Sequence, residues 1–256
     1  MLDGFTTESV YFRNIETGET FVWHAGGETP IRYMGASVTK AFHALFIYQQ
    51  IDAGSINFDS VISGVYAVYE EEFTGTVREA LNDSLRVSGT ASAFALANHV
   101  EELGLRPAYH AFLSEFGINI TTHGATGQNY YIEDAGRIAL AIFNYIESDA
   151  PNAAEFKQHL LAAVDGGKVD SWPSGLHEVN WTPTKRIYSR RYDIASKSGW
   201  WNSTVATSIA WHDMAFVYSD SPYILIVMSN VWENTANVRA IGNIFELVNY
   251  RYFAGR

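Results

Sequence analysis

The stretch Ser37-Val38-Thr39-Lys40, followed directly by Ala41-Phe42-His43-Ala44-Leu45-Phe46-Ile47-Tyr48, decides the fold. Its second part is apolar nearly all round, which is typical of a helix that is buried on every side. If this helix begins at Ser37, Lys40 lies three positions later, one turn along the same face. A buried helix rarely carries an idle lysine in its first turn, because burying a charged amine is costly. The stretch therefore predicts a central helix whose first turn carries a chemical function.

The pairing of a serine with a lysine at this spacing favours acyl transfer. A serine hydroxyl is a weak nucleophile until a base removes its proton, and a neutral or hydrogen-bonded amine can act as that base. The helix N-terminus adds backbone N–H groups and a partial positive charge where an oxyanion would develop. The alternative is an N-cap serine beside a solvated lysine. Against it, a second motif, Lys197-Ser198-Gly199, lies downstream, so two of only five lysines stand in such motifs.

The composition is that of a globular protein with a substantial core. The 256 residues are 47% hydrophobic and 18% charged, enough for one large domain or two interleaved ones. The net charge of −11 makes phosphate backbones and anionic membrane surfaces unfavourable partners. There is no cysteine, which excludes disulfides, thiolate metal sites and a cysteine nucleophile. The histidines show no H-E-x-x-H or carboxylate-paired spacing, so the sequence predicts no metal site and no cofactor.

Strand patterns occupy both ends of the chain, and helix patterns fill the middle. Residues 9–15 and 20–24 are rich in aromatic and β-branched residues around a Gly-bearing turn, which predicts a hairpin. The central helix is expected to end at Gly54, and Thr76-Val77-Arg78-Glu79 has the form of a capping box. The remaining expected helices cover about 90–103, 106–116, 132–147, 152–164 and 234–253, and the expected strands cover 192–196, 205–211, 214–218 and 223–228.

This order predicts an α+β fold, an α/β sandwich in which an antiparallel sheet is flanked by helices. The N-terminal hairpin can join the C-terminal strands in one sheet, because both ends of the chain supply strands. We expect residues 1–55 and 166–256 to form this sheet domain and residues 56–165 to form an inserted all-helical domain. No internal repeat, long linker or apolar run of the ~20 residues needed to span a bilayer interrupts this plan.

With this layout, three short segments resemble the signature boxes of the penicillin-recognising serine enzymes, and in detail those of the class A β-lactamases. Ser37-Val38-Thr39-Lys40 resembles the nucleophile box, and Lys197-Ser198-Gly199-Trp200 resembles the lysine-triplet strand. Ser88-Gly89-Thr90 stands where the family places a Ser-Asp-Asn box. Asn129-Tyr130-Tyr131-Ile132-Glu133-Asp134 resembles the start of the helix after the family's active-site loop. The boxes follow the family's order over nearly the whole chain, which implies a β-lactamase/transpeptidase-like fold.

The resemblance implies a catalytic role for each matching residue. Ser37 would be the acylating nucleophile, with Lys40 as its base. The backbone N–H groups of Ser37 and Trp200 would form the oxyanion hole. Ser88, helped by Lys197, would pass a proton to the departing nitrogen. These roles suit the chemistry, since acyl transfer needs a nucleophile, a base, a leaving-group acid and fixed donors where negative charge appears.

The resemblance also implies three substrate-binding residues, Thr90, Ser198 and Gly199. The middle box departs from the family's pattern at this point. Gly89 replaces the aspartate that braces the turn, and Thr90 replaces the asparagine that binds the substrate's amide. Thr90 can still donate one hydrogen bond, but it lacks the two-sided pattern of a carboxamide. The alternative for Ser88 is a helix-cap serine.

A larger departure concerns hydrolysis of the acyl-enzyme. Class A enzymes carry Glu-x-x-Leu-Asn in a loop before the helix that corresponds to 132–147, and that glutamate activates the deacylating water. Residues 117–128 contain no carboxylate. Of the nearest acids, Glu115 is expected to be a solvated helix-end charge and Glu133 to lie in a helix first turn. His123 is either a surface residue or one that polarises a water.

The strand after the lysine triplet also lacks the arginine with which family members often hold a substrate carboxylate. The sequence leaves open whether one of four other arginines replaces it: Arg186, Arg190, Arg191 and Arg239. The pair Trp200-Trp201 is expected either to form an apolar wall of the cleft or to belong to the core.

The sequence therefore predicts a class A β-lactamase-like serine hydrolase that forms an acyl-enzyme on Ser37 with β-lactam, peptide or ester substrates and deacylates slowly. The alternatives are a non-turnover penicillin-binding or sensor protein, a D-alanyl carboxypeptidase or esterase, and a scaffold whose cleft has decayed. The expected partner is a small molecule rather than nucleic acid or a membrane, and the oligomeric state stays open. The resemblance implies export to the cell envelope or exterior with the leader absent from this chain; the alternative is the cytoplasm.

Overall fold

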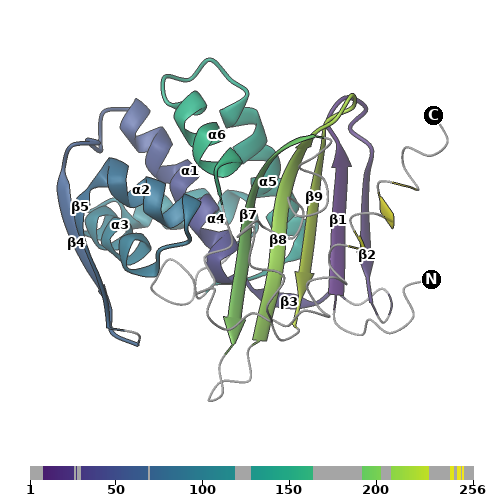
Figure 1. Ribbon diagram of the computed structural model, residues 1–256, viewed down its shortest axis with the longest axis horizontal. Helices are drawn as coiled ribbons and strands as arrows, with labels where there is room; N and C mark the ends of the chain where they lie inside the picture. Colours follow the sequence, from purple (N-terminus) through teal and green to yellow (C-terminus); the bar gives the residue numbers. More distant parts are fainter. Residues whose placement is uncertain are drawn as a thin grey trace, which may run out of the picture.

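Figure 1 shows the computed structural model of the chain, in which the helices between residues 39 and 161 lie on one side of a five-stranded sheet. The structure describes residues 8–25, 27, 30–68, 70–118, 128–163, 192–202 and 209–230, with a few positions between 243 and 250. Those few positions are helical, and the rest of the helix expected at 234–253 lies outside the described residues. No described helix is both long and apolar enough to cross a membrane.

The large sheet joins strands from both ends of the chain, as the sequence predicts. Its strand order is β2-β1-β9-β8-β7, and each neighbouring pair is antiparallel. The strands are β1 (Glu8–Asn14), β2 (Thr20–His24), β7 (Asp193–Asn202), β8 (Ile209–Tyr218) and β9 (Tyr223–Ser229). Strand β1 lies between β2 and β9, so the N-terminal hairpin is built into the C-terminal strands. Within the described sheet this order leaves β7, which carries Lys197, at one edge.

Strand β8 corrects the prediction of two separate strands at 205–211 and 214–218. Residues 209–218 form one continuous strand, and the start of the first predicted range lies outside the described residues. The polar pair His212-Asp213 suggested a break, but both residues are fully buried within the strand. The prediction was wrong because a histidine that is hydrogen-bonded through both ring nitrogens can occupy a buried strand interior.

The helices follow the predicted order with small shifts at their ends. A short 3₁₀ turn, η1 (Ala36–Val38), leads into the first helix, so that the α-helix begins at Thr39 rather than at Ser37. Gly54 follows that helix with φ +74°, the left-handed conformation that commonly ends a helix. The α-helices are α1 (Thr39–Asp52), α2 (Val77–Arg86), α3 (Thr90–Glu102), α4 (Arg106–Glu115), α5 (Ile132–Ile146) and α6 (Ala153–Leu161).

Two small antiparallel sheets, neither of which the sequence predicted, complete the described fold. Strand β3 (Arg32–Met34) pairs with β6 (Asn129–Tyr131), and β4 (Val61–Tyr66) pairs with β5 (Glu71–Thr76). Gly64 lets β4 lie against α3, because a Cβ at this position would be 2.4 Å from the backbone nitrogen of Ala95. The β4–β5 hairpin lies in the range expected to form an inserted all-helical domain, so this range is not helical throughout, and its boundaries stay a prediction.

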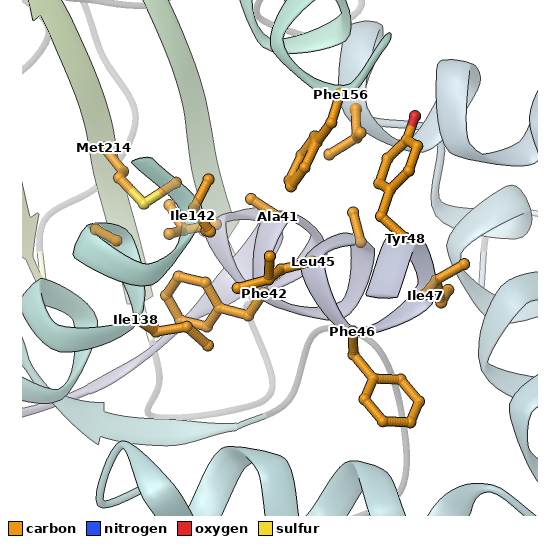
Figure 2. Packing of buried hydrophobic residues seen from close by; sticks show 14 of the residues in the cluster. Ala41, Phe42, Leu45, Phe46, Ile47, Tyr48, Ile138, Ile142, Phe156 and Met214 are labelled. Carbon is orange, nitrogen blue, oxygen red and sulfur yellow. The ribbon is translucent and has the colours of Figure 1, made fainter. Parts of the chain in front are cut away.

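Helix α1 is the centre of the hydrophobic core. Every residue from Ala41 to Tyr48 is buried. Figure 2 shows the side chains of this helix among Ile138 and Ile142 of α5, Phe156 of α6 and Met214 of β8. Burying a side chain of this size is worth roughly 1.5–3 kcal/mol, so the packing holds the helix firmly in place. The turn that precedes α1 is therefore attached to an element whose first ten residues are all buried.

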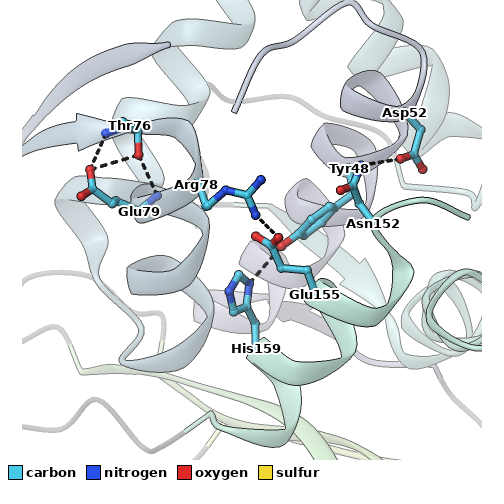
Figure 3. A network of polar contacts seen from close by, with 8 residues as sticks. All are labelled: Tyr48, Asp52, Thr76, Arg78, Glu79, Asn152, Glu155 and His159. Atoms are coloured by element: carbon cyan, nitrogen blue, oxygen red, sulfur yellow. Dashed lines mark hydrogen bonds and ion pairs between the residues drawn. The ribbon is translucent and has the colours of Figure 1, made fainter. Parts of the chain in front are cut away.

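A polar network ties the far end of α1 to α2 and α6 (Figure 3). The Tyr48 hydroxyl lies 2.9 Å from Nδ1 of His159 in a hydrogen bond, and Arg78 of α2 forms an ion pair with Glu155 of α6. The guanidinium of Arg78 also lies over the ring of Phe58, 3.8 Å from its centre. These contacts fix the direction of α2 relative to α1.

Helix α2 begins with the capping box that the sequence predicts. The Thr76 hydroxyl accepts a hydrogen bond from the Glu79 backbone N–H at 3.2 Å (Figure 3). In return, the Glu79 carboxylate accepts one from the Thr76 N–H at 2.7 Å. These bonds satisfy two N–H groups that the start of a helix otherwise leaves unpaired. The start of α2 matters for the candidate site because its other end leads directly to Ser88.

Candidate active site

The turn that carries Ser37 is strained at the residue before the serine. Ala36 has φ +44°, in the left-handed region that residues other than glycine rarely adopt, and it is buried. The backbone N–H of Gly35 donates to the carbonyl oxygen of Gln128 at 2.7 Å. Such strain costs of order 1–3 kcal/mol, persists only where the surrounding structure imposes it, and is common at active sites. Ser37 itself is half-buried.

Strand β3, which leads into this turn, is held to the large sheet by a buried histidine. Nε2 of His212 lies 2.7 Å from the Met34 carbonyl oxygen, and Nδ1 accepts from the Ser229 N–H at 3.1 Å. Because a backbone N–H can only donate, the ring proton is assigned to Nε2, which donates to Met34. Burial lowers the pKa of His212 to about 4, so the ring is neutral at physiological pH. His212 thus joins β8 and β9 to the strand that enters the Ser37 turn.

Strand β7 approaches the same turn so closely that only glycine fits at the contact. A Cβ at Gly199 would lie 2.7 Å from the backbone nitrogen of Val38 and 2.8 Å from that of Ser37. Real Cβ atoms are essentially never found that close to another heavy atom. The glycine therefore allows the β7 backbone to lie directly against the N–H groups at the start of η1.

Two buried lysine amines converge on Ser88, in the connection between α2 and α3. Lys197 Nζ donates to the Ser88 hydroxyl oxygen at 2.8 Å and to the Ser198 carbonyl oxygen at 2.8 Å. Lys40 Nζ donates to the Ser88 carbonyl oxygen at 2.5 Å and lies 3.5 Å from its hydroxyl oxygen. The Thr90 hydroxyl is a further acceptor for Lys40, at 3.3 Å. The structure thus brings together predicted site residues from three segments far apart in the sequence.

Burial and the neighbouring Lys197 hold the pKa of Lys40 well below its usual value of 10.5. Asp83 and, after it, Glu71 act in the opposite direction, because a nearby carboxylate favours the charged amine. Lys40 is buried, as the apolar run that follows it predicts. A lowered pKa increases the fraction of the amine that has a free lone pair, as a general base requires.

One contact expected from the sequence is not made. Among the described residues, no hydrogen bond joins the Ser37 hydroxyl to the Lys40 amine. The amine instead has three acceptor atoms on Ser88 and Thr90 within 3.5 Å. These acceptors hold it on the side of the α2–α3 connection, so the role of Lys40 as the base for Ser37 stays a prediction.

The α2–α3 connection is held by a residue of α2 that the sequence analysis missed, Asp83. Ser88 has φ +62°, and the N–H groups of Val87 and Gly89 both donate to the Asp83 carbonyl oxygen, at 3.2 and 3.1 Å. The Asp83 carboxylate occupies the open side of Gly89, where an added Cβ would lie 1.7 Å from Oδ2. A sequence signal for Asp83 does exist: it is an acidic residue in the last turn of a helix, where the helix dipole disfavours negative charge.

The residues considered for deacylation and for carboxylate binding are mostly placed elsewhere or not described. Glu133, in the first turn of α5, has its Oε1 3.4 Å from Nε2 of His24. Glu115 is exposed at the end of α4. The other candidates lie outside the described residues: His123, Arg186, Arg190, Arg191 and Arg239.

The Trp200 side chain belongs to a hydrophobic cluster of the large sheet. Trp200 lies opposite Trp211 of β8 and packs against this cluster, so its backbone rather than its ring is the part available for the predicted oxyanion role. Trp201 is half-buried. Within the described ranges, no group of His, Asp and Glu side chains is arranged to hold a metal ion.

No protein-family model and no curated protein matches the chain. Solved structures match it over nearly its whole length. A β-lactamase from Sphaerobacter thermophilus is similar at 17% identity and a TM-score of 0.68, covering 98% of this chain and 93% of the other. A β-lactamase from Chitinophaga pinensis is similar at 15% identity and 0.65, covering 93% and 94%. An ancestral class A β-lactamase is similar at 17% identity and 0.66, covering 95% and 93%. At these identities the likeness shows the fold.

Proposed function

We propose that this protein, whose fold is that of the class A β-lactamases, is a serine hydrolase that forms an acyl-enzyme on Ser37. The observation that carries the proposal is the convergence of two buried lysine amines on the Ser88 hydroxyl. Burying two amines beside each other lowers the stability of the fold. We infer that they are kept there because they take part in the reaction. The expected substrates are β-lactams, D-alanyl peptides or esters.

In the proposed reaction the Ser37 oxygen attacks the substrate's carbonyl carbon while its proton passes to Lys40. The lowered pKa of Lys40 suits this role, because it favours the neutral form of the amine that can accept a proton. The amine must turn from Ser88 and Thr90 toward Ser37 when substrate binds. The Ser88 hydroxyl, hydrogen-bonded to Lys197, gives its proton to the leaving nitrogen or oxygen and regains one from Lys40. The bond to the leaving group breaks, and the acyl group stays on Ser37.

The negative charge on the carbonyl oxygen would be met by the backbone N–H groups of Ser37 and Trp200. The close approach of Gly199 to the Ser37 turn supports this assignment, because it puts β7 beside the start of η1. One such donor is commonly worth about 10²–10³ in rate. A carboxylate on the substrate would then lie near Lys197 and Ser198, which carry the charge and hydroxyl suited to it.

We expect the acyl-enzyme to be released slowly. Fast deacylation needs a base that holds a water ~3 Å from the ester carbonyl. Residues 117–128 contain no carboxylate. Glu133, the next acid along the chain, is paired with His24. A burst of acylation followed by slow turnover is the kinetic behaviour that follows.

Intact-mass spectrometry after mixing with a fluorescent penicillin tests the proposal. The wild-type protein should gain the mass of one penicillin and keep it for hours, whereas Ser37→Ala should gain none. Ser114→Ala, which removes an exposed serine hydroxyl on α4, is the matched control and should label like the wild type. Equal labelling of Ser37→Ala would contradict the assignment, and no labelling of any variant would favour an inactive cleft.

The absence of a carboxylate from residues 117–128 also favours a second candidate function. This is a penicillin-binding or sensor protein that uses lasting acylation as its signal. The same experiment separates the two, because an adduct that never declines fits a sensor and one that declines over hours fits a slow hydrolase. Release of D-alanine from a D-alanyl-D-alanine peptide, or of alcohol from an activated ester, would identify a carboxypeptidase or an esterase. Nitrocefin turnover at ~10–10³ s⁻¹ would contradict slow release and require another base.

A further inference from the structure

The two lysines of the site create an electrostatic problem for the proposed reaction. Lys40 and Lys197 are each 1% exposed, and both amines lie within 3.5 Å of the Ser88 hydroxyl oxygen. When Lys40 accepts a proton during acylation, two positive charges face each other away from water. Such a state is unfavourable unless a negative charge lies close by.

Charged groups from three elements act on Lys40. Lys197 of β7 disfavours the charged form of the amine, whereas Asp83 of α2 and, less strongly, Glu71 of β5 favour it. Of these two carboxylates, Asp83 has the larger effect on Lys40. The position of Asp83 in the fold explains how its carboxylate comes to lie near the site.

The carboxylate of Asp83 occupies a space that a glycine leaves open. A Cβ at Gly89 would lie 1.7 Å from Asp83 Oδ2 and 2.7 Å from its Cγ, so no other residue fits at 89 while the carboxylate keeps its place. The Ser92 hydroxyl, which donates to the Gly89 carbonyl oxygen at 3.1 Å, borders the same space. Together with the bonds from Val87 and Gly89 to its carbonyl oxygen, this places Asp83 against the Ser88 turn through backbone and side chain alike.

Helix α2 offers no reason of its own for an aspartate at this position. Asp83 stands in the last turn of the helix, where the negative end of the helix dipole disfavours a carboxylate. Arg86, in the same turn, is the type of residue that this end favours. A residue that is unfavourable for its helix, yet fitted against the turn that holds Ser88, points to a role in the site.

We propose that Asp83 is a positioning residue: its backbone carbonyl holds the Ser88 turn, and its carboxylate, set in the space beside Gly89, is the counter-charge for Lys40 when Lys40 accepts the Ser37 proton. This inference rests on the proposed function, because the proton transfer belongs to it. The proposal also explains the glycine at position 89. The turn needs no side chain there, because the carboxylate of Asp83, on the preceding helix, fills that space.

Asp83→Asn removes the charge and keeps the shape, so it tests the proposal directly. Acylation by a fluorescent penicillin should slow by up to about tenfold, as expected when the pKa of the base falls by roughly one unit. The acid limb of the pH–rate profile should move to lower pH by about one unit, because the Lys40 ammonium loses its counter-charge. Glu102→Gln is the matched control, since it removes the same charge from a side chain that is 74% exposed on α3, and it should change neither quantity. An unchanged rate and limb in Asp83→Asn would overturn the proposal.

A second measurement separates failure of this inference from failure of the proposed function. The chain has only five lysines, so isotope-labelled lysine side chains can be titrated by NMR, with Lys40 assigned through Lys40→Arg. Asp83→Asn should lower the pKa of Lys40 by roughly one unit, and Glu102→Gln should leave it unchanged. If that pKa moves but no penicillin binds, the positioning role stands and the proposed function fails. If the pKa does not move, the positioning role fails whatever the substrate does.

Relocating the carboxylate is a further test. Gly89→Asp alone should be damaging, because the new Cβ meets the Asp83 carboxylate and places two like charges together. Asp83→Ala alone loses the counter-charge. The double variant Asp83→Ala/Gly89→Asp again has one carboxylate at the turn and should acylate at least about tenfold faster than either single variant. A double variant with wild-type thermal stability that acylates no faster than Asp83→Ala would overturn the proposal; if it does not fold, the Asp83→Asn result decides.

Discussion

Gly199 decides how near strand β7 can lie to the turn that carries Ser37. An added Cβ would meet two backbone nitrogens, at 2.7 and 2.8 Å, so no side chain can move aside to relieve the contact. We expect Gly199→Ala to slow acylation by about 100-fold or more, the usual cost of displacing an oxyanion donor. The same overpacking should lower the free energy of unfolding by about 1–3 kcal/mol. Penicillin labelling and urea denaturation measure the two effects.

Gly104→Ala is the control for this substitution. Gly104 has φ +69° and nothing lies within 4 Å of the position of its Cβ, so alanine there costs only about 1–2 kcal/mol of left-handed strain. Its acylation rate should equal that of the wild type. Similar labelling by the two alanine variants would show that the spacing between β7 and the Ser37 turn is not critical.

Lys40→Ala should slow acylation by roughly 10²–10⁴-fold, the usual worth of a positioned general base. In the wild type, burial and Lys197 lower the pKa of Lys40, which raises the unprotonated fraction of the amine at any given pH. The rate should therefore decline only as the pH falls through that lowered pKa, and not near the usual value of 10.5. Stopped-flow labelling across pH measures this profile. A rate that declines below pH 10, as for an ordinary lysine, would mean that Lys40 is not the base.

At the scale of helices and strands, the elements with strong local patterns were predictable. The apolar run after Lys40 gave the buried helix α1, and Thr76 with Glu79 gave the start of α2. The β4–β5 hairpin was missed because Gly64 interrupts the strand pattern, and its use is visible only where β4 meets α3. Strand β8 was divided in two because the partners of His212, on β3 and β9, come from distant parts of the sequence.

The capping box of α2 yields a prediction at this scale. Thr76→Ala removes the hydroxyl that accepts the Glu79 N–H, which should lower the free energy of unfolding by about 1 kcal/mol. Acylation should be unchanged, because packing against α1 and α6 still directs the helix toward Ser88. Urea denaturation and penicillin labelling of the same preparation test both parts. A loss of labelling without a loss of stability would mean that the helix start controls the Ser88 turn.

At the scale of the whole molecule, the candidate site was predictable in part. The motifs that contain Lys40, Ser88 and Lys197 could be read from the sequence, and the fold brings their polar atoms within 3.5 Å. Asp83 could not be assigned to the site, because its contact with Gly89 depends on how the chain turns after α2. The direction of the Lys40 amine likewise could not be predicted, because the sequence does not indicate which hydrogen-bond acceptors lie nearest to it.

Two buried histidines should make the whole protein sensitive to acid. Burial lowers the pKa values of His43 and His212 to about 4, below their ordinary value of 6.5. Between these values the unfolded chain binds protons that the folded protein does not, so stability falls as the pH falls from 6.5 toward 4. The loss should be up to roughly 2–3 kcal/mol for each histidine.

His43→Phe tests this origin. The phenyl ring can keep the ring contact with Tyr109, whose centre lies 4.9 Å from that of His43, and it binds no proton. Urea denaturation at about pH 4.5 and pH 7 should show a smaller difference for the variant than for the wild type. Equal differences would mean that other groups, such as acidic side chains, dominate the acid response.

Strand β1 pairs along its length with β9, from Glu8 opposite Ser229 to Asn14 opposite Tyr223, so neighbours in the sheet are separated by most of the chain. On the ribosome, the β1–β2 hairpin emerges early and keeps one edge unpaired until β9 has been made. Closing so long a loop is slow, and non-local contacts of this kind limit folding rates. Strand β7, which must lie against the Ser37 turn, also arrives late. A nascent chain can therefore bury much of α1 well before its last strands bring Lys197 and Gly199 to the Ser37 turn.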